Sequence, residues 1–322
     1  MPGRGITRPM PVYSKPRSLV ISSAASVALT LSLSACSEHF EVDGARAHAR
    51  VVHQVEAGPR IPGTRGHATV LAWLKSELSR LGARVEEQVI PDSSLGRPLE
   101  LHNVIAHFGP ASDRRIMLCA HWDSRPWCDE DSDSTYRNEP VPGANDGGSG
   151  VAVLLEVAEL MSRRAPPSAV DLVFFDGEDL GNAGHPEQYS LGARAFARSF
   201  VGDHPQWKPT AAFLFDMVGD RTLDIYPEAQ SRERAANLVD IVLDGARATS
   251  AIHFHPETRY TVIDDHVPLL EAGVPTVDII DFDYPAWHTH RDLPGQVSPA
   301  SLAEVSRVAA WIVYRSPLAL SR

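Results

Sequence analysis

The sequence is poor in cysteine, with only three in 322 residues. Cys36 lies near the N-terminus, which leaves Cys119 and Cys128 for the rest of the chain. So few cysteines exclude a disulfide scaffold, and the spacing of the last two is not that of a metal-binding pair. An exported protein could still oxidise Cys119 with Cys128. The alternative is a free Cys119, which lies in an apparent buried strand where a thiol packs as a small apolar group.

Positive charge is also scarce. The chain has 30 Lys and Arg residues against 41 Asp and Glu residues, a net charge of -11. No basic cluster in the body of the chain offsets these acids, which excludes a nucleic-acid-binding surface as the expected function. The hydrophobic share of 43% and the charged share of 22% are ordinary for a globular protein. We therefore expect partners that are neutral, cationic or small.

Beyond Cys36 the sequence lacks repeats, low-complexity tracts and long Gly/Ser linkers, so residues 36–322 are predicted to form a single α/β domain. Apolar runs of strand length alternate with helical patterns. The alternation predicts a three-layer αβα sandwich around a mostly parallel, mixed central sheet. The strands are expected at 101–108, 115–120, 171–175, 211–215, 222–226 and 274–280, and the helices at 70–81, 151–161, 190–201, 232–246 and 298–313.

The N-terminal segment differs in composition from the rest. Four basic residues precede an apolar run at 19–35 that contains no acid, which is the layout of an export signal. The run ends in Leu33-Ser-Ala-Cys36, which resembles the lipobox at which bacterial lipoproteins are cleaved and acylated. We predict a signal peptide at 1–35 and a lipid anchor on Cys36 that holds the exported protein to a membrane of the cell envelope or periplasm. An uncleaved anchor helix is the alternative, but the serines of the run make a poor membrane span.

Polar residues follow four of the predicted strands. In open α/β sheets, ligands bind beyond the carboxyl ends of the strands, so these four ends are expected to face one crevice. The residues are His121 and Asp123 after the first strand, the acidic stretch 176–179 after the second, Asp216 after the third, and Trp287 with His288 soon after the fourth.

Two of these motifs bring carboxylates to a turn. In Pro142-Gly-Ala-Asn-Asp-Gly-Gly-Ser-Gly150, glycines surround Asp146 at the expected start of a helix, although a simple capping loop would look alike. In Val173-Phe-Phe-Asp-Gly-Glu-Asp-Leu-Gly181, a strand runs into three carboxylates, which repel one another unless a cation or a proton intervenes. One of Glu178 and Asp179 can therefore bind a metal while the other transfers protons, with a solvated acidic turn as the alternative.

A third motif supplies imidazoles. The segment 281–292 places His288 and His290 beside Trp287, although a lone histidine is more often structural than a ligand. Histidine combined with two carboxylates suits zinc with one coordination position left open for a substrate.

The order of these motifs resembles the zinc-dependent aminopeptidase superfamily. Within it, four segments are similar to the glutaminyl cyclases of bacteria and animals, namely 144–150, 174–178, 264–268 and 286–289. The similarity extends from about Arg60 through the C-terminal helix. The resemblance implies an enzyme that converts the N-terminal glutamine of peptides or proteins to pyroglutamate and releases ammonia.

The resemblance also implies a set of site residues. One zinc ion is expected on Asp146, Asp179 and His288, with Glu178 as general acid and base. Asp179 departs from the glutamate common at its position and is one methylene shorter. The remaining expectations are Asp216 and Asp265 in a catalytic acidic network, Trp287 as a wall of the glutamine pocket, and Tyr189 as a substitute for a second pocket tryptophan of the animal enzymes.

The main alternative is a two-zinc aminopeptidase. His121 and Asp216 would then bind a second ion, Asp146 would bridge the two ions, and Asp123 would be a further ligand or a support to one. Three features favour the cyclase: Trp287 directly before His288, the Asp265-His-Val-Pro segment, and the Phe174-Phe-Asp-Gly-Glu178 run. A remote alternative is a lipoprotein that binds peptides without catalysis.

Overall fold

The computed structural model describes residues 40–93 and 96–320. The predicted signal peptide at 1–35 and the predicted lipidation site Cys36 lie outside the described residues. Among the residues that are described, no helix has the length and apolar character needed to cross a membrane.

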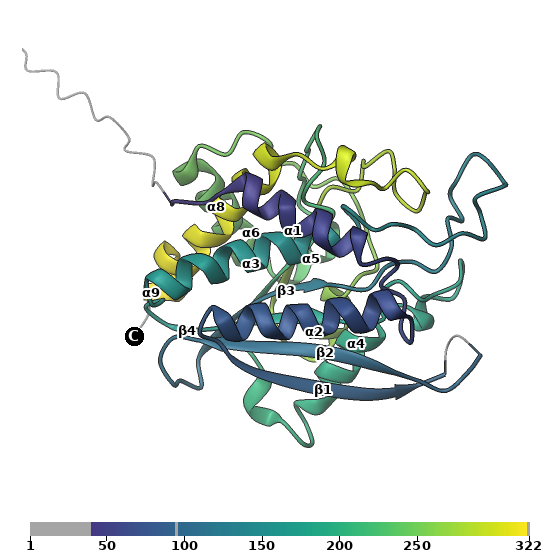
Figure 1. Cartoon of the computed structure of the whole chain (residues 1–322). Helices are drawn as coiled ribbons and strands as arrows, with labels where there is room; N and C mark the ends of the chain where they lie inside the picture. The colour runs from purple at the N-terminus through teal and green to yellow at the C-terminus, as the bar shows by residue number, and fades with distance from the viewer. Residues whose placement is uncertain (1–39, 94–95, 321–322) are drawn as a thin grey trace, which may run out of the picture. The chain divides into compact units, whose positions relative to one another are not determined.

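A six-stranded mixed sheet forms the middle of the fold, in the order β1-β2-β4-β3-β5-β6 (Figure 1). Strands β4, β3, β5 and β6 run parallel, whereas β2 is antiparallel to both β1 and β4. This confirms the predicted mostly parallel, mixed sheet. The strands are β1 (Arg84–Asp92), β2 (Leu99–Phe108), β3 (Arg115–His121), β4 (Ala169–Phe175), β5 (Ala211–Asp216) and β6 (Thr276–Ile280).

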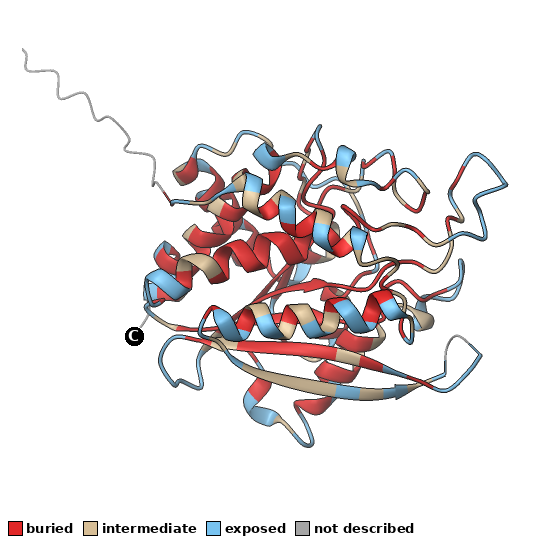
Figure 2. Ribbon diagram, in the orientation of Figure 1, coloured by how far each residue is buried: buried red, intermediate tan, exposed pale blue. Residues whose placement is uncertain are grey.

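Helices cover both faces of the sheet. The central strands are apolar on both faces, so Leu118 and Phe213 join the core on one face while Cys119 and Leu214 join the core on the other. The first face carries α2 (Arg65–Arg80), α3 (Gly148–Arg163), α6 (Ala236–Thr249) and α8 (Pro299–Arg315), with α1 (Gly44–Glu56) packed on α3 and α8. The second face carries α4 (Leu191–Ser199) and α7 (His266–Glu271). Burial is almost complete in α3 and in the central strands (Figure 2).

Two predictions of secondary structure differ from the structure. The stretch 222–226 is not a strand, because only Ile225 forms an isolated bridge, to Phe254. The helix predicted at 232–246 is two helices, α5 (Ala229–Arg234) and α6, separated at Ala235, whose ψ of 39° is not helical. The edge strand β1 and the helix α1 were not predicted.

Both cysteines of the described chain are free and buried, so the structure does not form the bridge that the sequence left open. Burial raises the pKa of Cys119 well above its usual value and that of Cys128 to about 11. These thiols are therefore protonated and shielded in the folded protein.

Candidate metal centre and active site

The carboxyl ends of the parallel strands meet at one edge of the sheet. His121 ends β3 and pairs with Phe175, which ends β4. Asp216 ends β5 and pairs with Ile280, which ends β6. The chain therefore leaves four neighbouring strands at the same edge, where the predicted site residues lie together.

Asp146 lies just before α3, where hydrogen bonds from the backbone to Asp292 hold it in place. The N–H groups of Asn145 and Asp146 donate to the two carboxylate oxygens of Asp292, at 2.8 and 3.1 Å. Gly147 follows with a φ of 74°, and a Cβ there would lie 2.4 Å from the carbonyl oxygen of Asp123. Only glycine fits this position, because both the left-handed backbone and the close approach exclude a side chain. Asp146 is thus fixed beside a helix N-terminus, which favours negative charge.

The acidic turn after β4 is anchored by Asp123. Its two carboxylate oxygens accept the N–H groups of Glu178 and Asp179, at 3.1 and 3.2 Å. Asp123 is fully buried, and its Oδ1 lies 3.5 Å from Nδ1 of His121. Asp123 therefore supports the turn that carries the neighbouring acids.

Asp146, Asp179 and His288 form a compact three-residue cluster. One ligand atom of each lies within 4.8 Å of the others. Nε2 of His288 lies 3.4 Å from Oδ1 of Asp179 and 3.7 Å from Oδ2 of Asp146. Burial lowers the pKa of His288, but Asp179, Asp129 and Asp146 outweigh it and raise the pKa to about 9.

Two buried oxygens of this cluster, Oδ2 of Asp146 and Oδ2 of Asp179, have no hydrogen-bond partner. Buried carboxylate oxygens are costly to leave unpaired, so the cluster fits a bound cation. Two carboxylates and one imidazole are a donor set that suits zinc.

A second cluster lies on the other side of Asp146. Nε2 of His121 lies 3.2 Å from Oδ1 of Asp146 and 3.1 Å from Oδ1 of Asp216. Burial opposes protonation of His121, but these carboxylates and Asp123 raise its pKa well above the usual value. His121 is thus paired directly with the residues that a second ion would need.

Glu178 lines a small cavity of about 70 Å³ together with Asp216, Asp264 and Trp287. Burial and the charges of Asp264 and Asp179 raise the pKa of Glu178 well above its usual value. Asp265, which the sequence singled out, is fully buried and does not line this cavity, whereas its neighbour Asp264 does.

The small cavity adjoins a wider one of about 460 Å³. Both are lined by Tyr189, Val262, Ile263, Phe282, Trp287 and His288. The ring of Trp287 stacks on that of His288 with 3.9 Å between centroids, and Phe282 lies 5.3 Å from Trp287. The structure therefore places Trp287 and Tyr189 in the walls of the site. An inner acidic pocket opens into an outer space with aromatic and aliphatic walls.

A third cluster of possible ligands, Asp264, His266 and Asp278, is buried behind the cavity. His266 lies 3.3 Å from Glu228 and 3.5 Å from Asp278. Burial and the surrounding acids raise the pKa of Asp278 well above its usual value. Oδ2 of Asp264 and both oxygens of Asp278 also lack a hydrogen-bond partner, but His266 and Asp278 do not line the cavity, whereas Asp146, Asp179 and His288 all do.

Several residues of the site were not predicted. Arg125 and Asp129 connect Asp179 to His288, Asp292 holds the loop at Asp146, and Asp264 faces Glu178. The sequence contained one signal that could have indicated two of these residues, the spacing of Arg125 and Asp129 four positions apart.

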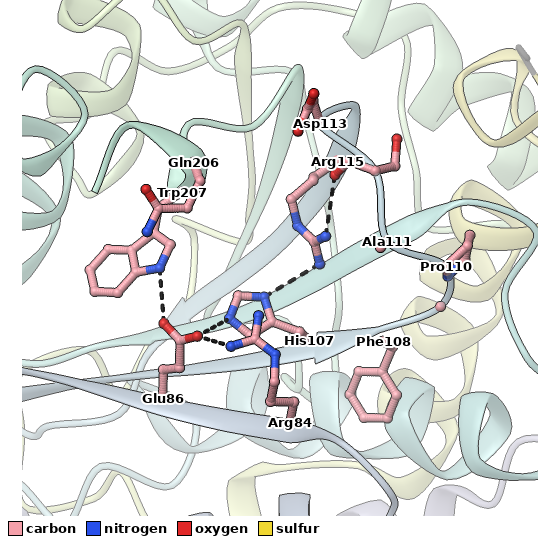
Figure 3. A pocket seen from close by; sticks show the side chains of 12 residues that line it. Arg84, Glu86, His107, Phe108, Pro110, Ala111, Asp113, Arg115, Gln206 and Trp207 are labelled. Carbon is pink, nitrogen blue, oxygen red and sulfur yellow. Dashed lines mark hydrogen bonds and ion pairs between the residues drawn. The ribbon is translucent and has the colours of Figure 1, made fainter. Parts of the chain in front are cut away.

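A further cavity of about 380 Å³ lies at the opposite edge of the sheet, lined by Arg84, Glu86, His107, Arg115 and Trp207 among others (Figure 3). Its polar groups pair with one another. Glu86 accepts from Nε1 of Trp207 at 3.1 Å and lies 3.6 Å from His107, and Arg115 lies 3.3 Å from His107. None of the possible metal-binding groups found among the described residues lies there. This cavity does not provide the chemistry of the first one.

Residues 103–313 match the model of peptidase family M28. The chain is 32% identical to the glutaminyl cyclase of Bacteroides thetaiotaomicron, with a TM-score of 0.82 over 87% of this chain and 100% of that one. It is 33% identical to a Zn-dependent exopeptidase of Parabacteroides distasonis, with a TM-score of 0.80 over 85% and 98%. A glutaminyl-peptide cyclotransferase-like protein of Bos taurus is 27% identical over 78% of this chain and 70% of the bovine one.

Proposed function

Because the chain belongs to peptidase family M28 and is similar to glutaminyl cyclases over most of its length, we propose that it is a zinc-dependent glutaminyl-peptide cyclotransferase. It converts the N-terminal glutamine of peptides to pyroglutamate and releases ammonia. The observation that carries this proposal is the cluster of Asp146, Asp179 and His288, with two unpaired buried oxygens, beside the cavity that Glu178 and Trp287 line.

Asp146, Asp179 and His288 would hold one zinc ion, which leaves a coordination position for the substrate. When bound, zinc supplies a Lewis acid that polarises the side-chain amide of the N-terminal glutamine. The substrate provides its own nucleophile, since its α-amine and the amide carbon belong to one residue and need no second molecule.

Glu178 moves the proton in this reaction. The α-amine forms a bond to the amide carbon and the bond from that carbon to the amide nitrogen breaks. The carboxylate of Glu178 takes the proton from the attacking amine and gives it to the departing ammonia. The raised pKa of Glu178 suits a group that must both accept and return a proton near neutral pH.

The surrounding residues set the conditions for this proton transfer. Asp265 is among the acids that raise the pKa of Glu178, and Asp216 acts on Asp264 in the same way. Trp287 gives the pocket an apolar wall against which the glutamine side chain can pack.

A two-zinc aminopeptidase remains the second candidate because His121, Asp146 and Asp216 also form a cluster. In that cluster Nε2 of His121 lies 3.2 and 3.1 Å from its two carboxylates. Nε2 of His288 lies farther from its own, at 3.7 and 3.4 Å, and Oδ2 of Asp146 and Oδ2 of Asp179 lack partners. This difference favours one zinc on the His288 side.

One experiment separates the candidates. The purified protein is analysed for bound zinc and incubated with a Gln-initiated and an Ala-initiated peptide, with Glu178→Gln as the control. We expect one tightly bound zinc per chain, ammonia and pyroglutamate from the first peptide, and no change in the second. Release of free alanine with two zinc ions would establish the aminopeptidase, and a chain without metal or turnover would indicate a peptide-binding lipoprotein. The Glu178→Gln variant should retain zinc and lose most turnover.

We also propose that residues 1–35 direct export, that Cys36 carries the lipid, and that residues 36–322 form the catalytic domain. The basic N-terminal segment, the apolar run and the Leu-Ser-Ala-Cys sequence support this. Replacement of Cys36 by alanine should move the protein from the membrane fraction to the soluble fraction of the producing bacterium. Unchanged membrane association of that variant would instead support an uncleaved anchor.

A further inference from the structure

Arg125 is a buried arginine whose side chain is 1% exposed and lies beside the metal cluster. Its Nη1 donates to Oδ1 of Asp179 at 2.7 Å. Its Nε and Nη2 donate to the two carboxylate oxygens of Asp129, both at 2.6 Å. One planar guanidinium thus holds two carboxylates in fixed positions, which a flexible ammonium group does not do.

One of these carboxylates is a proposed metal ligand, and the other contacts a second proposed ligand. The ligand is Asp179. Because Oδ1 of Asp179 accepts a hydrogen bond from Arg125, only its Oδ2 is left without a partner. Asp129 contacts the second proposed ligand, His288, because its Oδ1 lies 3.4 Å from Nδ1 of that histidine. The Nε2 atom of His288 then faces the cluster.

The contacts form a closed loop beside the metal position, from Arg125 to Asp179, on to His288, and back through Asp129. Two aromatic rings flank the guanidinium, Trp127 at 5.3 Å and Tyr189 at 5.7 Å from its central carbon. Burial opposes the charge of Arg125, but the ion pairs raise its pKa, so it stays cationic. The loop therefore contains a permanent, immobilised positive centre.

We propose that Arg125 is the positioning residue of the metal centre, fixing Asp179 directly and His288 through Asp129 so that one Asp179 oxygen and one His288 nitrogen face the zinc. This inference rests on the proposed zinc enzyme and names the residue that preorganises its ligands. It also explains how the short side chain of Asp179 works as a ligand, because the guanidinium holds the carboxylate in place. Partners that orient metal ligands typically affect metal affinity by about 10- to 100-fold.

The test is zinc affinity measured by competition with a chromogenic chelator on the intact protein. Arg125→Lys is the main variant because it keeps the positive charge and loses the planar fork, so a change reports geometry rather than charge. We expect zinc affinity to fall about 10- to 100-fold. Asp129→Asn should lower it as well, and the double variant should lose less than the sum of the two effects.

Arg50→Lys is the matched control. Arg50 is also a buried arginine with carboxylate partners, Glu77, Glu156 and Glu159, but it lies between α1, α2 and α3. Its replacement should lower the melting temperature of the metal-free protein and leave zinc affinity unchanged. Wild-type zinc affinity in Arg125→Lys would overturn the proposal. If Arg125→Lys does not fold, Asp129→Asn decides, since Asp129 is partly exposed and its replacement weakens the link between Arg125 and His288 while Arg125 and its contact with Asp179 remain.

The proposed cyclase activity and the proposed role of Arg125 can be refuted independently. A wild-type protein that binds zinc but does not cyclise glutamine would refute the cyclase and leave the role of Arg125 intact if the variant still loses zinc. A wild-type protein without affinity for zinc would overturn both.

Discussion

Asp123→Asn tests whether the turn after β4 must be fixed for the site to work. In the wild-type protein the Asp123 carboxylate accepts two backbone N–H groups, from Glu178 and Asp179. Asparagine retains one acceptor oxygen and turns an NH₂ group toward the other N–H. The variant therefore loses one hydrogen bond to a charged acceptor, which is worth about 1.5–3 kcal/mol.

If about 2 kcal/mol of that loss acts on the transition state, kcat/KM for a Gln-initiated peptide falls about 30-fold. Zinc affinity should fall too, because Asp179 is displaced with the turn. Ammonia release gives kcat/KM, chelator competition gives the affinity, and urea unfolding gives the stability.

Asp171→Asn is the control for Asp123→Asn. Asp171 is also a buried carboxylate, and it pairs with Arg115 and His107 at the opposite end of the parallel strands. The Asp171→Asn substitution should lower the free energy of unfolding without changing zinc affinity or kcat/KM. Should Asp123→Asn behave in the same way, Asp123 would be a support of the fold alone and the reasoning would be refuted.

Three further predictions concern stability and accessibility. Burial holds the pKa of Asp278 above its value in the unfolded chain, so above about pH 4 the unfolded state alone loses the proton. The free energy of unfolding of Asp278→Asn, relative to that of the wild type, should therefore rise by up to about 1.4 kcal/mol per pH unit. The rise should begin at about pH 4 and end at the pKa of Asp278 in the folded protein. Urea unfolding of both proteins that shows no such rise with pH would contradict this. Gly150→Ala should lower the free energy of unfolding by about 1–3 kcal/mol, because its Cβ would lie 2.1 Å from a β5 carbonyl oxygen, whereas Gly202→Ala, with nothing within 4 Å, should change it little. Cys119 and Cys128 should both react with a thiol reagent in denaturant without reductant and remain unreactive in the native protein, and a disulfide would show itself as no reaction in either state.

The central strands could be predicted because they are buried on both faces and their apolar character is continuous. Strand β1 could not, since it is an edge strand of half-buried residues in which charged side chains interrupt the pattern. Helix α1 was missed for a related reason. Its inward face includes Arg50 and Gln54, which are buried by pairing with residues distant in sequence rather than by being apolar.

The site residues divide in the same way. Asp146, Glu178, Asp179, Asp216 and His288 follow strands or precede a helix, so their position at one sheet edge follows from the order of the elements. The partners that orient them do not follow, because the contacts of Arg125 with Asp179 and of Asp292 with Asp146 join loops far apart in sequence. Which of two adjacent acids reaches the cavity, Asp264 or Asp265, depends on the local backbone at the start of α7 and not on composition.

The proposed ligands stand at positions 146, 179 and 288, so no short stretch of the chain contains the metal centre. During synthesis the last of them emerges only after all six strands of the sheet have been made. We expect a shortened chain that ends before His288 to lack one of the three proposed ligands and to bind the ion more weakly, however well its strands assemble. The three-residue cluster can therefore be complete only after the whole sheet has been made.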